Sequence, residues 1–416
     1  MKRGIRNITA FVTAAIISLG MTFVSYGEDS IKVNEDNNEG SESLIVEGMP
    51  EIVAEGAIVV DVNTGYTLYE KNIYTKYYPA SITKIMTATL SLENLKYEDI
   101  VTFSHDAVFS IEPGSSAGYL NEGEQITVEQ CLYGLMLISG NDIANGLAET
   151  VAGTMDEFAR MMTEKAKALG CINTNFTNAH GLHDENHYTC PYDMAIMARN
   201  AYINLEQFRT LISTVRAEIP PTAMCNETRY WLNSNRMIQQ GTAYYDEDCL
   251  GGKTGFTDQA GGTLVTFHNI NNRTVMIVIM KDTNSVGAYT DTKSICDYLH
   301  EKLDSAYIEK IDAAYTDLKN KEKESESAAQ IQVSNNSKDN VKAETTGKSD
   351  GEDNREGSSF PIGIKILLVV VLVAVIYYFI ISVQRNKKRR RRKSRAEAKG
   401  NTEKREIDII KTRRRR

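Results

Sequence analysis

The chain lacks the short motifs that mark many small metal and redox sites. Its 416 residues include six cysteines but no CxxC pair, which disfavours a zinc ribbon and a thioredoxin-type site. It also has no HExxH motif, so the helix of a zinc protease is not expected. We expect most of the cysteines to be small buried hydrophobes. Two disulfide pairings, Cys171–Cys190 and Cys225–Cys249, are left as candidates to test.

Alternating βαβ units are missing as well, which disfavours a doubly wound parallel sheet. Hairpin patterns stand instead at the two ends of a mostly helical region. Strands are expected at 57–62, 66–69, 263–267 and 274–279, and helices near 81–95, 127–138, 143–152, 155–169 and 292–303. The sequence therefore predicts an α/β fold in which one antiparallel sheet is covered by helices and its first and last strands pair.

Positive charge is scarce over most of the chain and concentrated at its end. Residues 28–360 hold 26 Lys and Arg against 51 Asp and Glu, a net charge of −25. Residues 385–416 hold 17 basic against 4 acidic residues, a net charge of +13. One globule would not separate charge in this way, so we expect the two parts to lie in different compartments.

The N-terminus has the pattern of an export signal. A basic start precedes the apolar run Ile8–Val24, and the small residues Ser25 and Gly27 precede a cut before Glu28 as signal peptidase prefers. The alternative is an uncleaved N-terminal anchor. Export is expected in both cases.

A second apolar run, Ile366–Val383, predicts one C-terminal transmembrane helix. Its 18 residues would be about 27 Å long as a helix, close to one hydrocarbon core. The basic segment that follows places the C-terminus in the cytoplasm and the acidic body outside. Nucleic-acid binding is the competing interpretation of the tail, but its position after a membrane span favours contact with anionic lipid.

These features divide the chain into six parts. They are a signal peptide (1–27), a flexible leader (28–45), a globular domain (46–303), a charged and partly disordered linker (304–360), the transmembrane segment (361–384) and a basic cytoplasmic tail (385–416). A charged helix is expected to continue from the domain to about residue 329.

Three short motifs carry the candidate chemistry, and the first contains Ser81 and Lys84. Their i, i+3 spacing at the start of a helix puts the amine within reach of the hydroxyl. Serine becomes a nucleophile when a base takes its proton, and a lysine is such a base when its pKa is lowered. The alternative is a helix-capping serine beside a solvated lysine, which this motif alone would favour.

The second motif is Ser139-Gly140-Asn141, and the third is Lys253-Thr254-Gly255 followed by Phe256 and Thr257. Ser139 could relay a proton and Asn141 could bind a substrate amide, although a helix cap is again the alternative. On an edge strand, Lys253 adds positive potential and Thr254 donates to an anion. Gly255 lets a substrate backbone approach closely.

Together the three motifs resemble the S-x-x-K, S-x-N and K-T-G set of penicillin-interacting serine enzymes. The segment Pro79-Ala80-Ser81-Ile82-Thr83-Lys84-Ile85-Met86-Thr87 and the stretches around the other two motifs resemble the low-molecular-mass D-alanyl-D-alanine carboxypeptidases. The resemblance covers roughly residues 46–303. It implies the serine β-lactamase and DD-peptidase fold, a peptidoglycan substrate, inhibition by β-lactams and no cofactor.

The resemblance also implies a role for each candidate residue. Ser81 attacks the carbonyl between two D-alanines, and Lys84 accepts its proton. Backbone N–H groups of Ser81 and Phe256 form the oxyanion hole. The remaining roles are proton return for Ser139 and Lys253, and substrate alignment for Asn141, Thr254, Gly255 and Thr257.

One departure from the family leaves alternatives open. Related sequences commonly place an arginine where this chain has Ala288, and that arginine helps to hold the substrate's terminal carboxylate. Without it, a DD-endopeptidase of the same fold gains weight beside the carboxypeptidase. A catalytically silent wall-binding protein is the third hypothesis.

The segment His180-Gly181-Leu182-His183-Asp184-Glu185-Asn186-His187 is the tempting metal candidate, because histidines and carboxylates are zinc ligands. It is rich in turn formers, and the family carries similar loops without metal. We therefore predict no metal in this loop.

Overall fold

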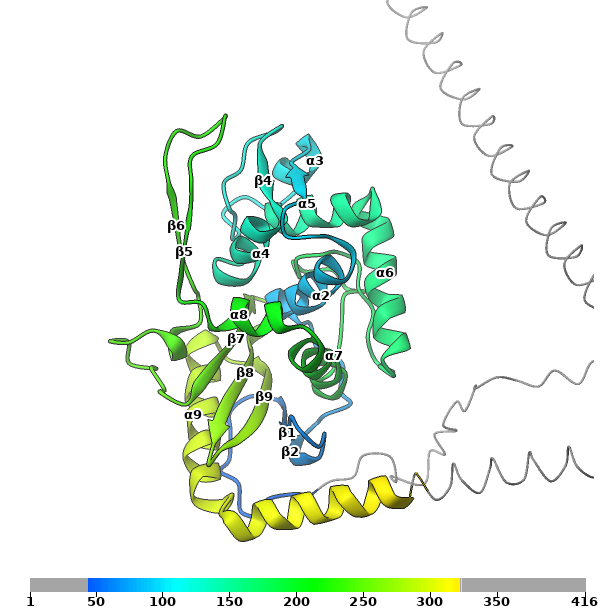
Figure 1. Ribbon diagram of the computed structural model, residues 1–416, viewed down its shortest axis with the longest axis vertical. Coiled ribbons are helices and arrows are strands. Elements are labelled where there is room, and N and C mark those ends of the chain that lie inside the picture. The colour runs from blue at the N-terminus through cyan, green and yellow to red at the C-terminus, as the bar shows by residue number, and fades with distance from the viewer. Residues whose placement is uncertain (1–43, 322, 324–416) are drawn as a thin grey trace, which may run out of the picture. The chain divides into compact units, whose positions relative to one another are not determined.

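The computed structural model describes residues 44–321 and 323 (Figure 1). The expected signal peptide, transmembrane segment and basic tail, and most of the leader and linker, lie outside these described residues. Among the residues that are described, we find no helix with the length and apolar character that a membrane span requires.

The elements of the described chain follow in sequence order. The strands are β1 (Gly56–Asp61), β2 (Thr67–Lys71), β3 (Ile100–Thr102), β4 (Gln125–Thr127), β5 (Arg216–Ile219), β6 (Arg229–Leu232), β7 (Cys249–Thr257), β8 (Gly261–Ile270) and β9 (Arg273–Asp282). The helices are η1 (Ala80–Thr83), α2 (Lys84–Asn94), α3 (His105–Phe109), α4 (Val128–Leu137), α5 (Asn141–Ala152), α6 (Met155–Ala168), α7 (Pro191–Asn204), α8 (Glu206–Ser213), η2 (Arg236–Ile238) and α9 (Ser285–Lys302). Residues 305–321 are also helical.

The main sheet has five strands in the order β2-β1-β9-β8-β7. Each neighbouring pair is antiparallel. The predicted pairing of the first and last strands is confirmed, because β1 lies beside β9 with Val59 opposite Ile277. The strand with the third motif, β7, lies at the edge of the sheet, as expected.

Alternate residues of the strands point to opposite faces of the sheet and fill two separate cores. Ile58 and Val278 belong to the core shared with α7 and α8. Val59 and Ile277 belong to the second core, which α9 closes with residues such as Leu299. Figure 1 shows α9 along one side of the sheet and α7 and α8 on the other. The predicted layered architecture is therefore confirmed.

Several elements were not predicted. Helices α3, α7 and α8 and the two small hairpins β3–β4 and β5–β6 are additions. Helix α7 carries a recognisable start, with Pro191 in its first turn and the Cys190 Sγ atom accepting from the N–H of Asp193. All six cysteines lie among the described residues and are free thiols. Both candidate disulfides are therefore wrong in this structure.

The helix 305–321 packs on the domain rather than leaving it. Ile311 is fully buried in the second core. The Tyr307 hydroxyl donates to the Leu44 carbonyl at 3.0 Å, and Arg273 pairs with Asp312 at 2.7 Å. The first part of the segment expected as a linker is thus attached to the sheet and to the start of the described chain.

Candidate active site

Ser81 and Lys84 lie on one turn at the start of α2. Ser81 is in η1, and the Lys84 Nζ atom is 3.1 Å from the Ser81 Oγ atom. The N-cap of α2 is Thr83 without a side-chain cap bond, and Lys84 has no exposed surface. The alternative of a capping serine beside a solvated lysine is therefore wrong.

The Lys84 amine is held by two further acceptors. It donates to the Asn141 Oδ1 atom and to the His180 carbonyl, both at 2.7 Å. Burial, and then the charge of Lys253, lower the pKa of Lys84 well below its ordinary value. A neutral amine has two N–H bonds and one lone pair. In the charged form the amine donates to the Ser81 Oγ atom as well. In the neutral form, with both N–H bonds directed at Asn141 and His180, the lone pair faces Ser81 and can take its proton.

Two residues beside these groups have unusual backbone conformations. Ala80 has a φ of 50° and Ser139 a φ of 63°, in the left-handed region that residues with a Cβ seldom occupy. Gly181 supports the first of them, since a Cβ on this glycine would lie 1.9 Å from the Ala80 carbonyl oxygen. Such strain is retained where the surrounding structure holds it, typically at functional sites.

Ser139-Gly140-Asn141 connects α4 to α5. The N-cap of α5 is Gly140, which makes no side-chain cap bond, so the capping alternative for this motif is also wrong. Asn141 is instead bonded to Lys84. The Ser139 Oγ atom is buried and has no hydrogen-bond partner within the described part of the chain.

Lys253 is a further buried polar group of the site, with 1% of its surface exposed. Its amine donates to the Thr254 carbonyl at 2.9 Å, and burial lowers the pKa of Lys253 to about 7. Two buried lysines thus lie close enough for one to lower the pKa of the other. A site of this kind attracts an anion and favours a neutral amine.

Gly255 serves a contact that the sequence did not reveal. The expectation that it admits a substrate backbone stays a prediction, and the structure adds a close approach to the chain's own η1. A Cβ on Gly255 would lie 2.8 Å from the Ser81 nitrogen and 2.4 Å from the Thr263 Oγ1 atom. The Thr263 hydroxyl also donates to the Pro79 carbonyl at 2.9 Å. Strands β7 and β8 therefore hold the turn that carries Ser81.

The last two candidate residues follow on β7. Phe256 is half exposed, and the Thr257 hydroxyl accepts from the N–H of Ala260 at 3.0 Å in the turn to β8. The structure thus brings Ser81, Lys84, Asn141 and Gly255 into direct contact. It places Thr257 in a turn rather than against these groups.

Sequence analysis missed two contributors. The His180 carbonyl binds Lys84 through the backbone, which no side-chain pattern reports. Ser234, just before η2, places its hydroxyl 2.7 Å from the Thr254 hydroxyl. The turn formers around His180 were the only available sign of the first, and nothing in the sequence marked the second.

The histidine loop has a structural role. The His187 Nε2 atom is 2.8 Å from the Thr83 hydroxyl, and its Nδ1 atom accepts from the N–H of Thr177 at 3.1 Å. Burial lowers the pKa of His187 to about 3. Both ring nitrogens are engaged by protein groups, so this residue supports the turn before Lys84.

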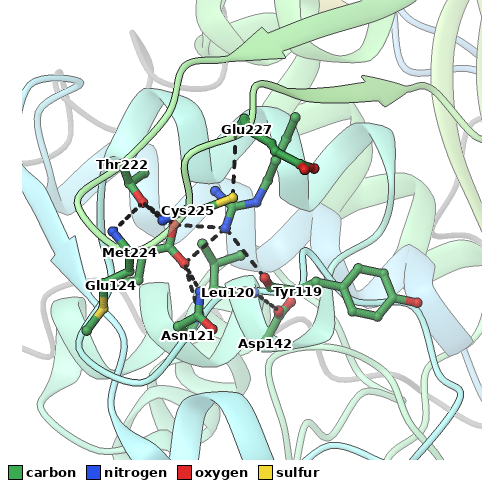
Figure 2. Close-up of polar contacts among 10 residues, drawn as sticks. Tyr119, Leu120, Asn121, Glu124, Asp142, Thr222, Met224, Cys225 and Glu227 are labelled. Carbon is green, nitrogen blue, oxygen red and sulfur yellow. Dashed lines mark hydrogen bonds and ion pairs between the residues drawn. The ribbon is translucent and has the colours of Figure 1, made fainter.

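A loop beside the site is tied to the second motif. The Asp142 Oδ1 atom accepts from the N–H of Gly118 at 2.8 Å. Figure 2 shows how the network continues to the β5–β6 connection, where the Thr222 hydroxyl donates to Glu124 at 2.6 Å. Arg229 pairs with the same buried carboxylate at 2.8 Å. Tyr119 remains 82% exposed on this loop.

Comparison with known proteins agrees with this geometry. The family model described as D-alanyl-D-alanine carboxypeptidase matches residues 44–284. The chain belongs to this family. The predicted family resemblance is therefore confirmed. It is similar to D-alanyl-D-alanine carboxypeptidase DacF of Bacillus subtilis, with 36% identity over 232 residues that cover 54% of this chain and 57% of the relative.

Further family members show the same extent of similarity. D-alanyl-D-alanine carboxypeptidase DacA of Escherichia coli is 31% identical over 261 residues, covering 60% of this chain and 62% of the relative. The chain thus spans less than two thirds of the length of these two relatives. The crystal structure of the Streptomyces K15 DD-transpeptidase aligns with a TM-score of 0.56 and 30% identity, over 60% of this chain and 98% of that one.

Proposed function

We propose that this family member is an exported serine D-Ala-D-Ala carboxypeptidase that trims peptidoglycan stem peptides. The observation that carries the proposal is the buried Lys84 amine, with two N–H acceptors fixed and its lone pair left for Ser81. This arrangement activates a serine without a histidine or a metal ion.

The reaction then follows in two steps. Ser81 attacks the carbonyl between the two D-alanines while Lys84 takes its proton, and the N–H groups of Ser81 and Phe256 receive the developing negative charge. The C–N bond breaks, and Ser139 and Lys253 help to return a proton to the departing D-alanine. Water hydrolyses the ester on Ser81. A β-lactam follows the first step and remains on the serine.

Recognition of the terminal carboxylate needs a cation other than one at position 288. Ala288 is 1% exposed and lies in the second core. Arg236 is exposed in η2, two residues after Ser234, whose hydroxyl touches Thr254. The N–H of Arg236 donates to the Tyr289 hydroxyl at 3.2 Å. We assign the carboxylate to Thr254 and Ser234, with Lys253 and Arg236 as the positive charges.

The location of the enzyme is part of the proposal. The N-terminal pattern supports export, and the apolar run with its basic flank supports a single C-terminal span with the catalytic domain outside the cell membrane. The basic tail then lies on anionic lipid in the cytoplasm. The six parts expected from the sequence remain our proposed organisation.

Two other functions are tested by the same experiment. A DD-endopeptidase would cut cross-linked muropeptide dimers, and a silent wall-binding protein would bind muropeptides without forming an acyl-enzyme. We expect the full chain to be labelled by fluorescent penicillin and to release D-alanine from a defined pentapeptide. Ser81→Ala should abolish both, whereas the control Ser213→Ala, at an exposed position of α8, should abolish neither.

Each outcome points to one function. Cleavage of dimers but not of the pentapeptide would identify an endopeptidase. Muropeptide binding without labelling would identify a silent protein. Labelling that survives in Ser81→Ala would overturn the assignment of the nucleophile.

A further inference from the structure

A second cluster of reactive side chains lies outside the three motifs, where α9 packs on the sheet. Ligand atoms of Asp246, His268 and Cys296 all lie within 4.8 Å of one another. Zinc binds oxygen, nitrogen and sulfur at about 2.0–2.3 Å in tetrahedral sites, so its ligand atoms are roughly 3.3–3.8 Å apart. Small side-chain rotations would bring these three atoms onto one ion.

His268 is the residue of this cluster that most needs a ligand. It lies on β8 with no exposed surface, and neither ring nitrogen has a hydrogen-bond partner. The Nδ1 atom lies 3.2 Å from the Asp246 Oδ2 atom, which is ion-pair distance without hydrogen-bond geometry. A buried polar group without a partner is destabilising. A metal ion would satisfy one ring nitrogen.

The other two groups are arranged to face the histidine. The Asp246 Oδ1 atom accepts from the N–H of Asp248 at 3.1 Å, which orients the carboxylate and leaves Oδ2 for an ion. Cys296, on α9, is 2% exposed. Burial, and then the charges of Asp246 and Cys249, raise the pKa of the Cys296 thiol. A bound metal ion would displace this proton.

Cys249 is a further thiol beside this cluster, although its Sγ atom lies outside the group within 4.8 Å and donates to the Gly251 carbonyl at 3.9 Å. It stands directly opposite His268 in the β7–β8 pair, and opposed residues of an antiparallel pair place their side chains on the same face. It also packs against the core cluster that contains Cys296. A rotation of the Cys249 side chain towards His268 would make two thiols, one imidazole and one carboxylate available, from β7, β8, α9 and the loop before β7.

We propose that Asp246, Cys249, His268 and Cys296 bind a zinc ion with a structural role. Nitrogen and sulfur donors in a closed, buried set favour zinc over the harder cations magnesium and calcium. The ion would fasten the start of β7 to β8 and α9. This site goes beyond the proposed peptidase function, and it would give two cysteines a role other than that of the buried hydrophobes expected for most of them.

The test measures metal directly in the full chain. Protein purified in detergent from zinc-supplemented medium should carry about one zinc per chain by elemental mass spectrometry. After chelation and reloading with cobalt, it should show the d–d bands of a tetrahedral ion and a thiolate charge-transfer band. Cys296→Ser and His268→Gln should lose the zinc at least tenfold more readily. Cys131→Ser, at a buried cysteine of α4, is the matched control and should keep it.

Three results would overturn the site. They are no bound metal in the unaltered chain, equal metal retention in Cys296→Ser and Cys131→Ser, and a Cys249–Cys296 disulfide in the purified protein. Circular dichroism of each variant separates loss of metal from loss of fold, and Asp246→Asn provides a milder variant where His268→Gln does not fold. Penicillin labelling of Ser81 is measured separately, so failure of the metal site and failure of the peptidase function are distinguishable.

Discussion

Gly255 packs against the backbone nitrogen of Ser81, so closely that a β-carbon on the glycine would lie 2.8 Å from that nitrogen. The third motif therefore supports Ser81, the proposed nucleophile, through direct contact of two backbones. The same contact makes the position of Ser81 dependent on the edge strand β7.

Gly255→Ala tests this dependence. The added methyl group meets Thr263 and the nitrogens of Ser81 and Ile82, so β7 or η1 must shift. We expect penicillin acylation to slow by about a hundredfold, since a displacement of about 1 Å has this effect on catalysis. Gly170→Ala is the control, because nothing lies within 4 Å of its added carbon. An alanine at the positive φ of Gly170 should lower the stability of the domain by roughly 1–2 kcal/mol, but the rate of acylation should be unchanged. Equal acylation rates in the two variants would contradict the contact.

The acylation rate should fall as the pH rises through about 7, where Lys253 loses its charge. The cation both attracts the substrate carboxylate and lowers the pKa of Lys84, so its loss weakens binding and activation together. Stopped-flow measurement of acylation over a pH series gives this alkaline limb of the pH–rate profile. Lys253→Arg keeps the charge at every pH tested and should remove the alkaline limb at a lower overall rate. A limb that persists unchanged in this variant would exclude Lys253 as its source.

His187 should make stability depend on pH in the acid range. Its pKa is about 3 in the folded chain against an ordinary 6.5, so the unfolded chain binds the proton first. Stability from this group is complete above about 6.5 and falls as the pH drops towards 3, by up to about 1.4 kcal/mol per pH unit. Urea unfolding of wild type and His187→Gln across this range tests the slope. In the variant, stability should depend less steeply on pH. If the plots of unfolding free energy against pH are parallel for the two proteins, His187 is not the source of the dependence.

Arg273→Met should strongly destabilise the domain. Arg273 pairs with Asp61, which has no exposed surface, and with Asp312 of the helix 305–321. Removing one partner of a buried pair leaves an unpaired charge and costs about 3–5 kcal/mol. Lys293→Met removes an exposed pair with Asp297 and should cost less than about 1 kcal/mol. Denaturant unfolding of both variants gives the comparison, and similar losses would show that Asp61 does not need Arg273.

The sheet and the catalytic groups were predictable because their patterns are local. The hairpin patterns that include 57–62 and 274–279 placed β1 and β9, and i, i+3 spacing placed the Lys84 amine within reach of Ser81. The role of the His180 carbonyl was not predictable, since a backbone group leaves no trace in residue type. The approach of η1 to Gly255 was not predicted for a related reason: the glycine indicates a close backbone contact but does not say which backbone comes close.

The helices that were missed depend on tertiary contacts. Helix α7 is buried around much of its circumference, with Pro191, Asp193, Met194, Ala195, Met197, Ala198 and Ala201 all buried, so its sequence lacks the one-sided period that predicts an amphipathic helix. The Asp246–His268–Cys296 cluster also depends on tertiary contacts. Its members are separated by 22 and 28 residues in the sequence and meet only when α9 packs on β8.

The pairing of β1 with β9 has a consequence for the order of synthesis. Val59 on β1 can pair with Ile277 on β9 only after the ribosome has made more than two hundred further residues. At roughly 5–20 residues per second, a ribosome needs on the order of 10–45 s to make the second partner after the first. Contacts so distant in sequence also slow folding. During this interval the emerging polypeptide cannot close its central sheet, which would suit the proposed export, since a translocation channel accepts an unfolded chain.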